Sequence, residues 1–364
     1  MKSRIIACLL AVLLAAGMTS CDMVNEMIDS LRPEQETETE PETVPETFEI
    51  IHADYTDPIT GEPTETDLSG SRPIAIVIKN DRVASPQFGL SRAAVVYEAL
   101  VEGGLTRFLA VYSDISKLDK VGPVIDSRSY FYDFATNHNA VFVQAGTTAE
   151  GNKIQVERGI TALDAIVGDM SPGFYRDATL KTTRGTENSI VTDSNGLRSR
   201  ANAFGVKLKV DVQMSPYSVE DYLQNRDMTG GNYCTHLSIP FSANMTVEYS
   251  YSTLTNTYSR SQYGEPHLDA STGKQLAFTN LIILICDYIT VNTSTGEMKI
   301  INSGRGSGYY VYGGSSVMIT WQRSNGATPI KLYEADGITP LHIASGNTYV
   351  AVASPKLSGK ISFE

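Results

Sequence analysis

The chain has 364 residues and a formal net charge of −12, and this charge is unevenly distributed. Residues 22–50 contain ten acidic residues and one arginine, which leaves residues 51–364 with 31 acidic and 26 basic residues, a net charge of −5. That length is sufficient for two domains of ~100–200 residues, and the acidic balance argues against nucleic-acid binding through a basic surface.

The N-terminus is typical of a bacterial lipoprotein signal. Lys2 and Arg4 precede an apolar run over residues 5–17, which is shorter than the ~20 residues that a membrane-spanning helix needs. Met18-Thr19-Ser20-Cys21 resembles a lipobox, so we expect cleavage before Cys21 and a diacylglyceryl thioether on its sulfur. An ordinary signal peptide with an incidental Cys21 is the alternative. The lipoprotein interpretation predicts anchoring to the outer face of the cytoplasmic membrane, because two acyl chains hold a protein stably where one does not.

The segment after Cys21 is predicted to be a tether. Residues 30–48 are rich in Glu, Thr and Pro and show no apolar period. Such a composition cannot bury enough apolar surface to offset the entropy lost on ordering. We therefore expect residues 21–50 to be a lipidated cysteine followed by a disordered acidic spacer.

Cysteine and histidine positions argue against a metal centre. If Cys8 leaves with the signal and Cys21 is lipidated, Cys234 and Cys286 remain. An exported chain permits one disulfide between them, but Cys286 follows the apolar run 281–285, which favours a buried free thiol. The five histidines are scattered and no CxxC or HExxH motif occurs, so we expect no zinc site and no cofactor.

The first half of the body, residues 51–205, alternates strand-like and helix-like segments. Residues 74–78, 95–101, 107–112 and 140–144 are predicted strands, because they are β-branched or aromatic and bounded by Gly, Pro or Asn. Residues 129–137 and 193–204 are predicted helices, the second capped by Asp193 or Ser194. This alternation predicts an N-terminal α/β domain with a largely buried sheet.

The second half, residues 206–364, is rich in Tyr, Ser, Thr and Gly and has short alternating segments between turn signals such as Ser271-Thr272-Gly273. The predicted strands are 245–251, 257–262, 281–288, 299–302, 308–312, 316–322, 330–333 and 348–352. We therefore expect a mostly antiparallel β-rich C-terminal domain, and an α+β fold for the chain as a whole.

Several motifs carry a family resemblance. The segments are Arg72-Pro73 to Asn80, Pro86 to Ser91, Val96 to Phe108, Val121-Gly122-Pro123, Phe174 to Asp177, Pro266 to Gly273, and Ile319-Thr320-Trp321. Together they resemble the YerB-type lipoprotein family (DUF3048 type), a Gram-positive envelope family built from a domain of unknown function in two parts. The resemblance spans residues 55–355 and implies architecture and location rather than a mechanism.

The chain departs from the pattern of that family at three polar positions. The pattern has a second arginine after Gly-Pro, a strand ending in His-Ala-Gly, and a later His-Asn. Here these positions hold Ile125 (with Arg128 kept), Gln144 and Glu187 (before Asn188). The resemblance implies that any catalytic chemistry built on those groups is lost in this chain.

Glu98 and Glu102 are the first candidate pair. On a strand their spacing places both carboxylates on one face but about 13 Å apart, beyond the ~5–9.5 Å used by glycosidase pairs. We therefore favour one structural carboxylate paired with Arg107 or Arg128 over an acid/base pair.

Three arginines lie among aromatic residues: Arg107, Arg128 and Arg176. Such an arginine either pairs internally with a carboxylate or binds an anionic ligand through two hydrogen bonds. Because Glu98, Asp126 and Asp177 are near in sequence, we favour internal pairing and keep recognition of a ligand or partner as the alternative.

His267 and Asp269 form the second candidate pair. Residues two apart on a strand share a face, so Asp269 could orient His267 as a general base. No serine or cysteine nucleophile lies in a recognisable elbow, so we favour a loop-ordering role before the turn at Ser271. The stretch Gly304-Arg305-Gly306-Ser307-Gly308 lacks the Lys-Ser/Thr of a phosphate-binding loop and continues as a strand, which predicts a tight β connection.

The leading hypothesis is a non-catalytic, lipid-anchored envelope protein that binds a protein partner or cell-wall material. Its candidate binding residues are Glu98, Glu102, Arg107, Arg128, Arg176, Asp177, Asn188, His267 and Asp269. The alternative is a hydrolase or transferase of envelope glycans that uses Glu98 or Asp269 with His267. A solute-binding component of a transporter is disfavoured, because such proteins have two similar α/β lobes.

Overall fold

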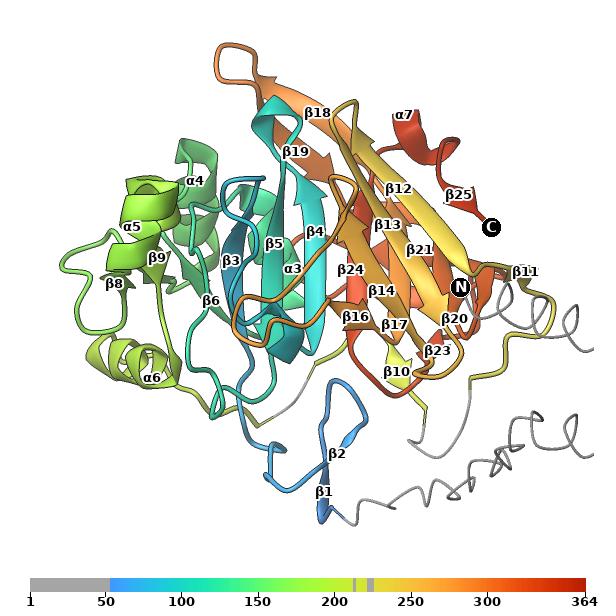
Figure 1. The fold of residues 1–364 in the computed structure, drawn as a ribbon, viewed down its shortest axis with the longest axis horizontal. Coiled ribbons are helices and arrows are strands. Elements are labelled where there is room, and N and C mark those ends of the chain that lie inside the picture. The colour runs from blue at the N-terminus through green and yellow to red at the C-terminus, as the bar shows by residue number, and fades with distance from the viewer. Residues whose placement is uncertain (1–52, 212–213, 221–225) are drawn as a thin grey trace, which may run out of the picture. The chain divides into compact units, whose positions relative to one another are not determined.

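An 11-stranded mixed sheet runs through both halves of the chain (Figure 1) in the computed structural model, which describes residues 53–211, 214–220 and 226–364. In spatial order its strands are β11 (Asn232–Tyr233), β21 (Ser315–Arg323), β20 (Gly304–Tyr312), β17 (Asn280–Ile285), β24 (Thr348–Ala353), β4 (Val95–Leu100), β5 (Thr106–Tyr112), β3 (Ile74–Asn80), β6 (Val141–Gln144) and β7 (Leu163–Asp164), with β22 (Lys331–Glu334) paired to β21. β24 pairs in parallel with both β17 and β4. A strand near the C-terminus thus joins the two halves, and residues 51–364 form one compact unit.

A second, antiparallel sheet from the C-terminal half covers one face of the central sheet. Its strands are β15 (Glu265–Pro266), β14 (Thr257–Gln262), β13 (Met245–Ser252), β12 (His236–Ser242) and β25 (Ser362–Phe363), with β16 (Ala277–Phe278) paired to β14. The side chains of Ile76 and Phe108 on the central sheet share one apolar cluster with those of Val247 and Tyr249 on β13. Burial of that shared surface stabilises the contact between the sheets.

The opposite face of the central sheet packs against α3 (Ser129–Thr136), whose Tyr130, Phe131 and Phe134 share a second cluster with Val77 and Leu109. The other helices are α4 (Ala149–Arg158), α5 (Ala178–Arg184), α6 (Ser194–Ala203) and α7 (Pro355–Ser358), with 3₁₀ turns η1 (Leu90–Arg92), η2 (Glu102–Gly104) and η3 (Thr186–Asn188). Thr148, Asp177 and Asp193 cap the N-termini of α4, α5 and α6, where each accepts a hydrogen bond from the backbone of the first turn.

Four small two-stranded sheets complete the fold. They are β1 (Tyr55–Thr56) with β2 (Pro63–Thr64), β8 (Tyr175–Arg176) with β9 (Ile190–Val191), β10 (Ser218–Val219) with β23 (His342–Ile343), and β18 (Asp287–Asn292) with β19 (Glu297–Ile301). β18 and β19 form a hairpin that extends beyond the central sheet at the top of Figure 1. Among the described residues, no helix has the length and apolarity required to cross a membrane.

The predicted α+β class is confirmed, with the long helices in the first half and a β-rich second half. The prediction of one strand over 281–288 is wrong, because the segment divides at Cys286 into β17 in the central sheet and β18 in the hairpin. The buried backbone N–H of Cys286 still donates to the carbonyl of Ala353, and the chain then leaves the sheet. β12, α4 and α5 were not predicted.

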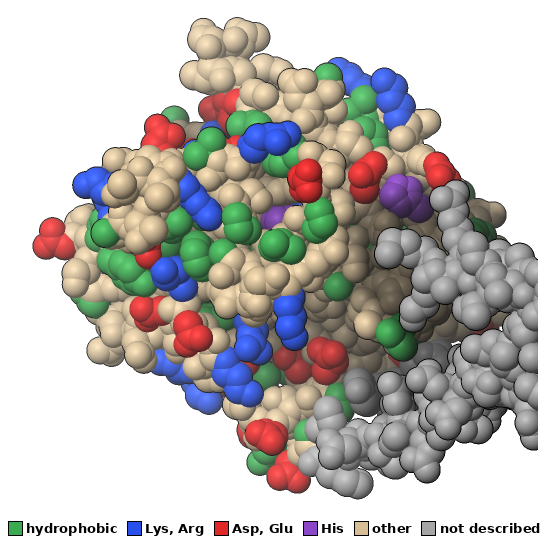
Figure 2. Space-filling view, in the orientation of Figure 1, with side chains coloured by type: hydrophobic (Ala, Val, Ile, Leu, Met, Phe, Trp, Pro, Cys, Tyr) green, Lys and Arg blue, Asp and Glu red, His purple; other side chains and the backbone are tan. Residues whose placement is uncertain are grey.

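The predictions for the cysteines can be compared with the structure, whereas those for the N-terminal segment cannot. Cys234 and Cys286 are buried free thiols, as favoured over a disulfide, and burial raises the pKa of Cys234 to about 11. The signal, Cys21 and the tether lie outside the described residues. On the face drawn in Figure 2, basic and acidic side chains are interspersed, in agreement with the mildly acidic balance of residues 51–364.

Candidate functional site

Glu98 on β4 is fully buried, and its carboxylate accepts four hydrogen bonds. Oε1 accepts from Asn80 Nδ2 at 3.0 Å and Thr106 Oγ1 at 2.6 Å. Oε2 accepts from Arg260 Nη2 and Tyr349 Oη, each at 2.7 Å. Since a carboxylate has about four lone-pair sites, these donors occupy all of its accepting capacity. The structure thus holds Glu98 as an internal carboxylate with no oxygen free to act on a substrate.

The Glu98–Arg260 ion pair joins the two halves of the chain. Glu98 lies in the central sheet, whereas Arg260 lies on β14 of the second sheet, and both side chains are 0% exposed. The Arg260 guanidinium also lies 5.2 Å from the centre of the Phe108 ring. Neither charge would be tolerated here without the other, because removing one partner leaves an uncompensated charge in the interior.

His267 extends the same network and does not pair with Asp269. Arg260 Nη1 donates to His267 Nδ1, and His267 Nε2 lies 2.6 Å from Gln87 Oε1, which assigns the proton of the neutral ring to Nε2. Burial, assisted by the Arg260 charge, holds the pKa of His267 well below its usual value of 6.5. We name Asn80, Gln87, Glu98, Thr106, Arg260, His267 and Tyr349 the junction network.

Asp269 orders loops on both sides of the same interface. Its carboxylate accepts from the backbone N–H of Gly89 at 3.1 Å and of Ser91 at 2.7 Å, and from Ser91 Oγ at 2.6 Å. It also accepts from Ser271 N at 2.7 Å, which confirms the loop-ordering interpretation. The acid/base arrangement of His267 with Asp269 is not formed, because each side chain is committed to different partners.

Glu102, Arg107, Asp126 and Arg128 form a second polar cluster. Arg128 contacts both oxygens of Glu102, its closest approach being 2.6 Å, and reaches Asp126 at 2.5 Å. Arg107 binds the same Asp126 at 2.9 Å. The internal pairing predicted for these arginines is confirmed. Burial favours the neutral acid, but the hydrogen bonds and charge of Arg128 prevail and lower the pKa of Glu102.

The predicted strand over 95–101 ends at Leu100, so Glu102 lies in η2 and not beside Glu98.

Gln144, at one of the departures from the family pattern, accepts from Ser127 Oγ at 2.5 Å and donates to Asp164 Oδ2 at 2.7 Å. Gln144 is therefore committed to structural hydrogen bonds with Asp164 and with Ser127, the residue before Arg128.

The remaining candidates lie around α5 and are not part of either network. Arg176 donates to the carbonyl of Thr186 at 2.6 Å, rather than to a carboxylate, so its predicted pairing with Asp177 is wrong. Asp177 instead caps α5 and pairs with Lys120 at 2.8 Å. Asn188 is buried and donates to the carbonyl of Arg184. Within the described part of the chain, no group of three or more His, Cys, Asp or Glu side chains could hold a metal ion.

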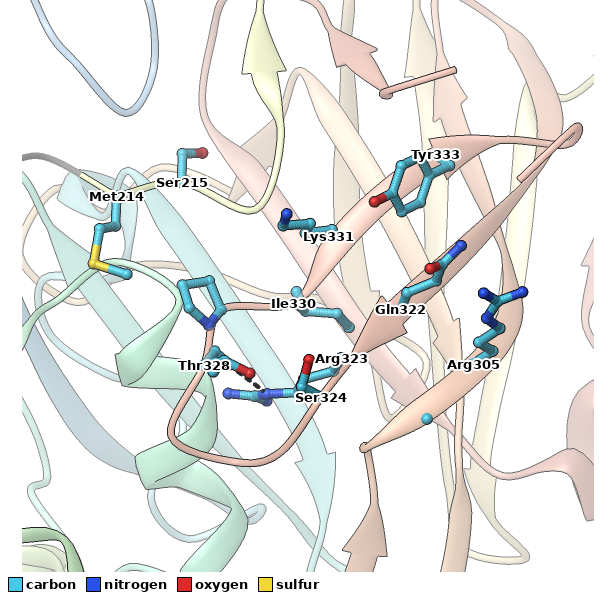
Figure 3. Close-up of a pocket in the computed structure, with 12 residues that line it drawn as sticks. Met214, Ser215, Arg305, Gln322, Arg323, Ser324, Thr328, Ile330, Lys331 and Tyr333 are labelled. Carbon is cyan, nitrogen blue, oxygen red and sulfur yellow. Dashed lines mark hydrogen bonds between the residues drawn. The ribbon is translucent and has the colours of Figure 1, made fainter. Parts of the chain in front are cut away.

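A solvent-accessible pocket of about 780 Å³ lies beside β20, β21 and β22 (Figure 3). Three of its lining residues, Arg305, Arg323 and Lys331, are basic and none is acidic. Residues 304–308 begin β20, so they form no phosphate-binding loop, but they lie within a strand and not in the predicted tight connection. Arg305 was not among the predicted site residues. The sequence does indicate one thing about this residue: side chains alternate along a strand, so Arg305 and Gly306 lie on opposite faces of β20.

Two comparisons with known sequences identify the relatives of this chain. Residues 59–207 match the N-terminal domain, and residues 237–350 the C-terminal domain, of the family described as "Protein of unknown function (DUF3048)". The chain belongs to the DUF3048 family. It is 30% identical over 279 residues to "Putative lipoprotein YerB" from Bacillus subtilis, covering 75% of this chain and 80% of that protein.

The crystal structure of YerB from Bacillus subtilis has a similar fold, with a TM-score of 0.71 at 27% identity over 85% of this chain and 99% of the other. The junction network connects the two DUF3048 domains within one molecule. Glu98 and His267 lie in segments that match the N-terminal and C-terminal domains respectively. The two domains of this member thus share a sheet, a core and a buried ion pair.

Proposed function

We propose that this DUF3048 protein is a lipoprotein of the outer face of the cytoplasmic membrane that acts by binding an envelope component. The observation that carries the proposal is the interior position of Glu98, His267 and Asp269. These residues are at most 1% exposed, and protein donors and acceptors hold all three. They are the groups on which glycan hydrolysis or transfer would depend.

The N-terminal sequence and the relatives support the location. Met18-Thr19-Ser20-Cys21 follows a short apolar run, and the relative from Bacillus subtilis is itself described as a putative lipoprotein. The acidic segment 22–50 would separate the folded body from the lipid. At roughly 3.3–3.6 Å per extended residue it spans at most ~100 Å, which is ample for reaching a component of the envelope.

The anchor is tested by expressing the full chain and its Cys21→Ala variant in a Gram-positive host fed an alkyne analogue of palmitate. We expect the wild type to carry the label and sediment with membranes. The variant should lose the label and leave the membrane fraction, because a single thioether site carries the anchor. An unlabelled wild type, or a variant that keeps the label, would contradict lipidation at Cys21.

The binding role is tested by in-cell crosslinking of the anchored wild type, followed by mass spectrometry. We expect reproducible crosslinks from the folded body to one envelope protein or to wall material. The enzyme alternative predicts something else: turnover of an envelope glycan that is lost in a folded Glu98→Gln variant. Observing that turnover would overturn the proposal.

A further inference from the structure

The pocket beside β20, β21 and β22 is lined by basic side chains and by no acidic one. The pairing of β20, β21 and β22 sets Arg305 opposite Gln322 and Gln322 opposite Lys331. Directly opposed residues of antiparallel strands face the same side of a sheet. With strands about 4.8 Å apart, the Cα atoms of Arg305 and Lys331 are roughly 10 Å apart on that face.

Arg305 and Lys331 differ from the paired basic residues of the two halves in having no acidic partner. Arg107, Arg128 and Lys120 each form an ion pair with a neighbouring carboxylate. Arg305 and Lys331 are exposed, and within residues 53–211, 214–220 and 226–364 neither makes an ion pair. Their charges therefore remain available to an external anion.

Neutral hydrogen-bonding groups lie between and beside the two cations. Gln322 stands between them on β21, and Tyr333 lies two residues beyond Lys331 on the same face of β22. In the view of Figure 3, the Tyr333 hydroxyl and the Lys331 ammonium point toward the side of the pocket that holds Ser215. Amide, phenol and hydroxyl groups of this kind recognise ligand hydroxyls.

Arg323 is the third basic residue of the lining and is fixed in position. It is 4% exposed, and its donors to the carbonyls of Thr328 at 2.7 Å and Asp133 at 2.6 Å hold the guanidinium in place. Its Nη1 finds no partner among the described residues. With no acidic side chain in the lining, these three basic residues give the pocket a positive potential in a protein of negative net charge.

We propose that this pocket binds a hydroxyl-rich chain that carries repeated anionic groups, either phosphate or carboxylate. Its volume of about 780 Å³ lies in the range of small-molecule sites, so it fits a short segment of a chain rather than a protein surface. Two exposed cations roughly 10 Å apart favour a ligand with at least two charges over a single inorganic anion. The inference deepens the proposed function, on which it rests, by naming a site and a ligand class.

The test measures binding of the detergent-solubilised full chain to three polymers: poly(glycerol phosphate), polygalacturonate and neutral dextran. The site variant is Arg305→Ala/Lys331→Ala. The control variant Arg198→Ala/Lys299→Ala removes two exposed basic residues from α6 and β19, so the net charge changes equally. We expect wild type and control to bind one or both anionic polymers and not dextran. The site variant should bind at least about tenfold more weakly, and binding should weaken with added salt.

Each outcome decides a separate point. A preference for poly(glycerol phosphate) or for polygalacturonate identifies the anionic group and supports the site. Equal losses in both variants, or no binding of either polymer by the wild type, would overturn it. If the polymers do not bind but the in-cell crosslinks persist, the site proposal fails while the proposed function stands. If the wild type neither binds a polymer nor forms in-cell crosslinks, the site proposal and the proposed function are both refuted.

Discussion

The junction network and the pocket beside β22 use the same kinds of polar residue in opposite ways. In the junction, Arg260 is fully buried and faces the carboxylate of Glu98 at 2.7 Å. In the pocket, Arg305 and Lys331 are exposed and make no ion pair with a described residue. Both regions belong to β-sheets of one compact unit.

The comparison separates structural from available charges. A buried arginine whose donors are used within the protein stabilises the contact between its elements and has little left to offer a ligand. An exposed arginine or lysine with no acidic neighbour contributes little to folding, since even paired surface charges are worth only ~0–1 kcal/mol. Position and partners, rather than residue type, therefore decide which cations can recognise an anion.

The largest expected effect is that of Glu98→Ala. The substitution leaves Arg260 as an unpaired buried charge and removes the acceptor of Asn80, Thr106 and Tyr349. We expect the free energy of unfolding to fall by about 3–5 kcal/mol, measured by urea denaturation. The double variant Glu98→Leu/Arg260→Met should be much less destabilised, because it removes both charges. A loss below about 1 kcal/mol for Glu98→Ala would show that the network does not hold the halves together.

A smaller, pH-dependent effect should follow from His267. Its pKa in the folded protein is held well below the usual 6.5, so the unfolded chain binds its proton first as the pH falls. The contribution of neutral His267 to the free energy of unfolding is therefore fully present above pH 6.5. It declines below that pH by up to about 1.4 kcal/mol per pH unit. His267→Gln should reduce this decline between pH 6.5 and 5.

His138 provides the control for that measurement. Burial lowers the pKa of His138 to about 3, and its ring contacts Tyr97 outside the junction network. Protonation of His138 should contribute independently to the fall in the free energy of unfolding below pH 6.5. His138→Gln and His267→Gln should thus each reduce the slope of that fall, and the double variant should remove most of it. An unchanged slope in His267→Gln would contradict the buried neutral state of that ring.

Much of the fold was predictable because local patterns and final positions agree. The predicted strands at 74–78 and 107–112 contain the continuous apolar runs 74–78 and 108–112, which become buried parts of central strands. The start of α6 was predicted from its two candidate caps, Asp193 and Ser194, of which Asp193 is the cap in the structure. β12 was missed because Pro240 interrupts its alternating pattern. α4 was missed because only one of its ten residues is buried, so the sequence shows no apolar helical period there.

The candidate site was less predictable because its contacts are non-local. Glu98 and Arg260 are 162 residues apart, so no spacing rule connects them. The predictions considered Arg107 and Arg128 as partners of Glu98, since these lie near it in sequence, but Arg260 is brought there by the second sheet. Arg305 and Lys331 become neighbours only through the register of β20, β21 and β22. A sequence reveals alternation along a strand but not which strands adjoin.

The smallest expected effect completes the comparison. Arg305→Ala/Lys331→Ala should change the free energy of unfolding by no more than about 0.5 kcal/mol, because both side chains are exposed and have no acidic partner to lose. Urea denaturation of the full chain measures it beside Glu98→Ala. Weaker polymer binding with unchanged stability would separate recognition from folding in one protein. If the double variant were instead destabilised by 2 kcal/mol or more (roughly the scale of lost buried contacts), these cations would be structural, and the distinction between the two regions would fail.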